Sequence, residues 1–102
     1  MKEKQILVVI KKPGEAHKVE PLFDNTLEAL QAAVGGKIDT VTICTDLVAV
    51  VNRECLDLPY NCTFANMQIF GPVVFVGAKE DEFASLKAAT IPMILRELGG
   101  RS

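Results

Sequence analysis

The hydrophobic pattern predicts two strands that are buried on both faces. Gln5–Lys11 and Val73–Val76 are apolar runs without the polar alternation of a strand that faces water. A continuous run of this kind is typical of a strand covered on both sides, and therefore central in its sheet. Two further β-rich runs, Lys37–Ile43 and Leu47–Val51, are separated by Cys44-Thr45-Asp46 and predict a hairpin.

Between these strands the periodicity changes to that of a helix. Three apolar residues recur at helical spacing: Leu27, Leu30 and Val34. Asn25 or Thr26 can cap the first turn, since either side chain can accept a hydrogen bond from a free N–H group there. Gly35 and Gly36 follow, and glycine ends helices because it adopts the left-handed conformation at little cost. We expect a helix over Thr26–Val34, packed on one face of the sheet.

Proline and glycine mark the remaining boundaries. Pro13-Gly14 predicts a hairpin from the first strand into a short strand over Ala16–Glu20, which Pro21 would end. Residues 55–67 show no clear pattern, and a long loop of this kind often carries function.

The last segment, Ser85–Leu98, has the composition of a helix. Pro92 interrupts it, because proline inside a helix removes a hydrogen bond. We therefore expect either a kink at Pro92 or a new helix that starts near Thr90. This helix should cover the second face of the sheet or its edge.

These elements predict an α+β fold. We expect a single two-layer domain over residues 1–102, with a mainly antiparallel sheet of about five strands, one central helix and one C-terminal helix. A hydrophobic content of 49 % supplies a packed core and argues against disorder. The predicted core residues are Ile6, Val8, Ile10, Leu27, Leu30, Val34, Ile38, Val41, Val74 and Val76.

Charge and hydropathy exclude several functions. The formal net charge of −2 argues against non-specific binding of nucleic acid, which depends on basic patches. No apolar run approaches the length of a membrane-spanning helix, about 18 residues. The apolar run Ile6–Ile10 is short for a signal peptide and lacks a small-residue cleavage site. We therefore expect a cytoplasmic protein with no membrane contact.

The chain has three cysteines, Cys44, Cys55 and Cys62, and one histidine, His17. No two cysteines have the close spacing of a structural zinc site, so we predict no metal and no cofactor. A cysteine nucleophile would need His17 as its base, oriented by Asp46 or Asp57, and nothing in their spacing favours such a set. We predict that the protein is not an enzyme.

Several motifs carry a resemblance to a known family. They are Pro13-Gly14, Asn25-Thr26-Leu27-Glu28-Ala29-Leu30-Gln31, Val34-Gly35-Gly36, Leu58-Pro59-Tyr60-Asn61 and Phe83-Ala84-Ser85-Leu86. These motifs are spread over nearly the whole chain, which resembles a family of small uncharacterised proteins labelled as a domain of unknown function. Members of that family occur in Firmicutes and in their phages and mobile elements. Many members have a basic residue after the Leu-Pro-x-Asn loop, where this chain has Cys62, which weakens any anion site there. The resemblance implies a bacterial or phage accessory protein and no particular activity.

Without a catalytic set, the leading prediction is a non-enzymatic accessory or interaction domain with an unknown protein partner. The candidate interaction surface is the loop of Leu58, Pro59, Tyr60 and Asn61 together with the final helix, and Asn25, Thr26, Gly35 and Gly36 are predicted to be structural. Tyr60 is the kind of aromatic residue that anchors interfaces. Its alternative role is to cover the core at the rim.

Two alternatives remain beside this prediction. The final helix carries apolar residues at positions 91, 94, 95 and 98, which would allow self-association as a homodimer. A small-ligand-binding regulatory module would use a pocket floored by Phe70 and Phe75 and edged by Asn61. A cysteine-dependent enzyme or a metal-binding protein is less favoured.

Overall fold

The computed structural model describes residues 4–80 and 82–99 of the chain. Within these residues the chain forms eight strands, two α-helices and one 3-10 turn. In chain order they are β1 (Gln5–Lys11), β2 (Lys18–Asp24), α1 (Leu27–Val34), β3 (Ile38–Cys44), β4 (Leu47–Asn52), η1 (Cys55–Asp57), β5 (Tyr60–Phe64), β6 (Met67–Phe70), β7 (Val73–Lys79), β8 (Glu82–Ala84) and α2 (Thr90–Gly99). The predicted α+β class is confirmed, whereas about five strands was too low a number.

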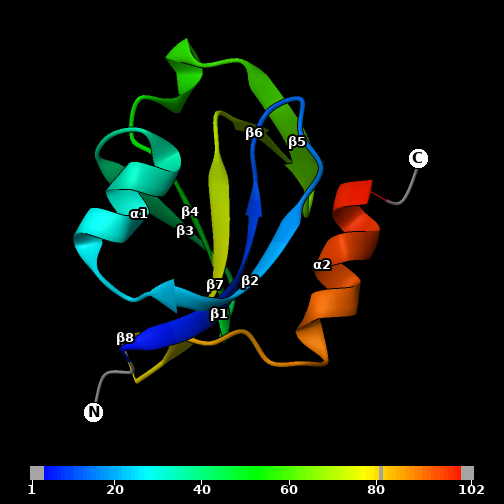
Figure 1. Cartoon of the computed structure of the whole chain (residues 1–102). Helices are drawn as coiled ribbons and strands as arrows, with labels where there is room; N and C mark the ends of the chain where they lie inside the picture. Colours follow the sequence, from blue (N-terminus) through cyan, green and yellow to red (C-terminus); the bar gives the residue numbers. More distant parts are fainter. Residues whose placement is uncertain (1–3, 81, 100–102) are drawn as a thin grey trace.

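The main sheet has the strand order β2-β1-β7-β4-β3, and each neighbouring pair is antiparallel (Figure 1). The two continuous apolar runs form β1 and β7, and both lie inside the sheet, as predicted. β8 pairs with the end of β7. β5 and β6 form a separate two-stranded ribbon.

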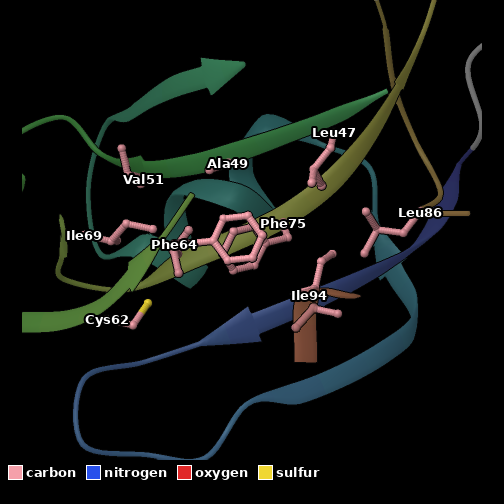
Figure 2. Close-up of a cluster of buried hydrophobic side chains, with 11 residues drawn as sticks. Leu47, Ala49, Val51, Cys62, Phe64, Ile69, Phe75, Leu86 and Ile94 are labelled. Carbon is pink, nitrogen blue, oxygen red and sulfur yellow. The ribbon is translucent and has the colours of Figure 1, made fainter. Parts of the chain in front are cut away.

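Both faces of the main sheet are covered, because alternate residues of a strand point to opposite faces. Leu30 and Val34 of α1 pack on one face, against residues such as Val8, Val50 and Val74. The β5–β6 ribbon and α2 cover the other face (Figure 1). The cluster on that face is drawn in Figure 2, where Phe64 of the ribbon lies against Phe75 of β7. The structure therefore has three layers rather than the predicted two. The final helix covers the second face, which was one of its two expected positions, and the ribbon beside it was not predicted.

Six of the predicted core residues are buried: Ile6, Val8, Leu30, Val34, Val74 and Val76. Three more, Ile10, Ile38 and Val41, are partly buried against the same clusters. Leu27 was predicted wrongly, since its side chain is 54 % exposed. The buried residues of α1 are Leu30 and Val34, whereas Leu27 lies in the first turn, directly after the cap.

Both predicted hairpins are present, as β1–β2 and β3–β4. The second strand of the first hairpin continues through Pro21, which was predicted to end it. Proline has no N–H group and is tolerated in an edge strand or at an irregularity of the ladder. Both conditions hold here, because β2 is at the edge and its register shifts between Ile6 and Val8, opposite Pro21.

Only the later part of Ser85–Leu98 is helical, since α2 begins at Thr90. Pro92 therefore lies in the first turn, where a proline has no intrahelical hydrogen bond to lose. The segment before the helix runs beside β1 instead. There the Leu7 N–H donates to Ser85 Oγ at 3.0 Å, and the Leu86 N–H donates to the Leu7 carbonyl at 2.9 Å.

Candidate functional site

The loop predicted as an interaction surface is fastened to the rest of the protein by Asn61. Its side-chain amide donates to the carbonyl oxygens of Lys11 and Gly71, each at 2.8 Å. Its Oδ1 accepts a hydrogen bond from Lys11 Nζ at 3.0 Å. These contacts use the donors and the acceptor of Asn61 within the chain, so its principal role in this structure is to join β1, β5 and the turn before β7.

The other three residues of this loop differ in exposure. Leu58 is half-buried, Pro59 is exposed, and Tyr60 is 52 % exposed. The Tyr60 ring meets the ring of Phe70 edge-on at 5.8 Å, and its hydroxyl shares a hydrogen bond with Thr63 Oγ1 at 2.7 Å. Tyr60 therefore covers the ribbon at its rim while presenting half of its surface outward.

The residues predicted to be structural take up four positions around α1. Thr26 is the N-cap, and its hydroxyl accepts from the Ala29 N–H at 3.1 Å. Asn25 is buried and its amide donates to the carbonyl of Phe83. Gly35 has a φ of 84°, and the N–H groups of Gly35 and Gly36 both donate to the Gln31 carbonyl. This pattern is the left-handed glycine exit expected from the sequence.

A further residue caps the end of α1, Asn52, and no sequence pattern predicts this role. Its side-chain amide donates to the Val34 carbonyl at 3.0 Å, and its Oδ1 accepts from the Glu54 N–H at 2.8 Å. Asn52 is 8 % exposed, so these bonds satisfy a buried polar group. It joins the end of β4 to the end of α1.

The apolar residues of α2 pack toward the sheet. Ile94 is fully buried, and three neighbours are partly buried against the same cluster: Ile91, Leu95 and Leu98. Met93 is the more exposed apolar residue of the helix, at 39 %. The stripe considered for self-association therefore has a partner within the chain.

The cysteines and the histidine lie in separate elements. Cys44 ends β3, Cys55 begins η1, Cys62 is in β5, and His17 is in the β1–β2 loop. Burial raises the pKa of the Cys62 thiol, and the nearby Lys11 ammonium opposes this shift. No three histidine, cysteine or acidic side chains of the described residues are grouped as metal ligands.

One of the two acidic residues considered as an orienter, Asp46, is paired elsewhere. Its carboxylate accepts from Lys87 Nζ at 2.9 Å and from the Cys44 thiol at 3.6 Å. The hydrogen bond and charge of Lys87 lower the pKa of Asp46, and Asp46 in turn raises the pKa of Lys87. Asp57, the other candidate, is in the exposed part of η1.

The predicted pocket between Phe70 and Phe75 takes a different form. Phe75 is fully buried against Phe64, with ring centroids 4.7 Å apart, and lines neither of two cavities that border β3. Phe70 borders a small apolar cavity of about 90 Å³, next to Val41 and Met67. A larger hollow of about 750 Å³ opens beside β3 and β8. Its lining residues include Thr40, Thr42, Ala78, Lys79, Glu82 and Lys87.

The two edges of the main sheet differ in chemistry. The β2 edge contains Pro21, the Lys18–Glu20 pair and the register shift against β1. β3 pairs with β4, and the pairings of the described residues give it no second neighbour. Its sequence, Ile38-Asp39-Thr40-Val41-Thr42-Ile43-Cys44, contains no proline and no lysine. A strand edge that is free on one side and rich in β-branched residues is able to accept another strand.

A comparison with protein-family models identifies the family. Residues 3–99 match the model described as Domain of unknown function (DUF3846). The chain belongs to this family. This match confirms the predicted membership of a family described as a domain of unknown function.

No curated protein and no solved structure matched this DUF3846 chain. Neither described helix is long and apolar enough to cross a membrane.

Proposed function

We propose that this DUF3846 chain is a non-enzymatic accessory domain, of bacterial or mobile-element origin, that binds a protein partner along the edge of β3. The partner would add an extended segment to the main sheet by backbone hydrogen bonds. The observation that carries this proposal is the contrast between the two sheet edges. The β2 edge has a proline, a lysine–glutamate pair and a register shift, all of which oppose strand addition. The β3 edge has no proline and no lysine along seven residues, and Asp39 is its one charged residue.

The side chains of β3 also suit strand addition. Thr40 and Thr42 are exposed on one face, while Val41 and Ile43 are partly buried on the other. β-branched residues favour extended backbone, and the half-buried valine and isoleucine would gain apolar contact from a neighbouring strand. The irregularity of β3 lies near its end, between Thr42 and Cys44, so Ile38–Thr42 keeps a regular ladder.

The test is affinity capture from the host organism with matched edge variants. The variant Thr40→Lys with Thr42→Lys places two charges on the β3 edge, which natural edge strands use to repel other strands. The control, Val19→Lys with Leu22→Lys, also introduces two lysines, at exposed positions of the β2 edge. We expect the wild type and the control to retain a common partner, which the β3 variant loses.

Capture of the same proteins by all three baits, or of none by the wild type, would overturn the proposal. Tyr60→Ala serves as a third comparison, since it removes the exposed aromatic of the predicted loop surface. Loss of the partner from this variant alone would transfer the interaction to that loop.

A small-ligand-binding module is the second candidate, and the hollow of about 750 Å³ favours it. Its mixed lining of threonine hydroxyls, Lys79 and Glu82 suits a polar molecule rather than an apolar one. A polar metabolite library screened by thermal shift tests this function. A ligand present at 100 times its Kd would add about 2.7 kcal/mol of stability, and a flat screen would remove this candidate.

A further inference from the structure

We infer that the segment paired with the β3 edge is β3 of a second copy, antiparallel and related by a two-fold axis beside Val41. This inference rests on the proposed use of the β3 edge and names its partner. The two main sheets would join through their β3 strands into one continuous sheet. Such an interface uses the same surface on both copies, as two-fold dimers require.

The sequence of β3 is close to symmetric about Val41. An antiparallel pair centred there places Val41 opposite Val41, and Thr40 opposite Thr42 of the other copy. Directly opposed threonines and opposed β-branched residues are favourable cross-strand pairs. β3 therefore presents the same side chains in both directions at its three central positions.

Charge selects this register over a neighbouring one. Asp39 is the one charged residue of β3. In the register centred on Val41 it faces Ile43 of the other copy, so the two Asp39 carboxylates lie four positions apart, about 14 Å along the strands. A register centred on Thr40 would make the two carboxylates diagonal neighbours at about 7–8 Å, where like charges repel.

Burial favours the same arrangement. Val41 and Ile43 are partly buried at the margin of the cluster drawn in Figure 2. In the paired sheet Val41 would meet its own copy, and Ile43 would lie diagonal to that valine. The apolar cluster of each copy would then continue across the two-fold axis, as expected for a stable homodimer interface.

Engineered cysteines test the pairing and its register. Cys44→Ser with Cys55→Ser removes the thiols that are not buried and gives the background. Val41→Cys in this background places two thiols directly opposite each other, at a Cβ separation of about 4.5–5.5 Å that a small shift brings within disulfide range. Asp39→Cys is the matched control on the same strand and face. Its two thiols would be about 14 Å apart, which is too far for a disulfide.

After mild oxidation we expect Val41→Cys to run on a non-reducing gel at twice the chain mass of 11.1 kDa, and Asp39→Cys to remain a monomer. Native mass spectrometry of the untreated wild type should show the same dimer. Circular dichroism melting curves establish that each variant is folded. Equal cross-linking of both variants, or of neither while both are folded, would overturn the inference.

The same set separates this inference from the proposed function. A monomeric wild type whose protein partner is still lost on Thr40→Lys with Thr42→Lys would refute self-pairing and leave edge binding intact. A dimer that survives those two lysines would show that self-association uses another face, and would refute the pairing proposed here.

Discussion

Leu27 and Leu30 offer a direct measurement of what α1 contributes to stability. They are the same residue type in the same short helix, but Leu27 is 54 % exposed and Leu30 is 2 % exposed. Leu30→Ala removes a fully buried side chain and leaves a cavity above the sheet, so we expect a loss of about 3–4 kcal/mol. Leu27→Ala removes less than half as much buried surface and introduces a better helix former. We expect a loss of about 1 kcal/mol or less.

Urea denaturation followed by far-ultraviolet circular dichroism measures both losses, since the chain has no tryptophan to report by fluorescence. With a slope of about 1.5 kcal/mol per molar urea, Leu30→Ala should lower the unfolding midpoint by about 2 M, and Leu27→Ala by well under 1 M. Equal losses in the two variants, or a loss below about 1 kcal/mol at Leu30, would show that α1 does not meet the sheet through Leu30.

Three further predictions concern single contacts. A methyl group in Gly77→Ala would clash with the backbone carbonyl of Ser85, so the melting temperature should fall by about 10 °C or more. Ala65 has a φ of 51°, and Ala65→Gly should remove up to about 1 kcal/mol of strain and raise the melting temperature by a few degrees. The lowered pKa of Asp46 means that its pairing with Lys87 stabilises the protein above about pH 4, and that this stability is lost as the pH falls through the lowered pKa. Lys87→Met should therefore lower the melting temperature slightly at neutral pH, with a difference that vanishes in acid.

The sequence predicts best where one physical requirement decides the structure. The apolar runs of β1 and β7 have no polar face that could be exposed to water. Such strands are therefore expected in the interior of a sheet that is covered on both faces. The exit of α1 needs a residue at positive φ, and Gly35 supplies it. Leu27 was misplaced because periodicity gives the face of a helix but not how far the helix extends over the sheet.

The β5–β6 ribbon was missed because its turn lacks the usual residues. Ala65 and Asn66 both have positive φ, a geometry that hairpins normally build with Asn-Gly or Asp-Gly. The Asn61 side chain donates to the carbonyl of Lys11, fifty positions earlier in the chain. No local sequence pattern indicates such a contact. The absence of proline and lysine from β3 and its Thr-Val-Thr symmetry are visible in the sequence, but the strand order that places β3 at the edge was not predicted.

The central position of β7 has a consequence for the order in which the fold can form. β1–β2, β3–β4 and β5–β6 are local hairpins that close short loops, whereas β7 joins Val9–Lys11 to Val48–Val51 across long stretches of chain. Because non-local pairings form slowly, the hairpins can assemble early, and the pairing of β1 and β4 with β7 follows later. During ribosomal synthesis β1 and β4 would present unsatisfied apolar edges until residues 73–79 emerge, and that interval is when a chaperone would matter most to this chain.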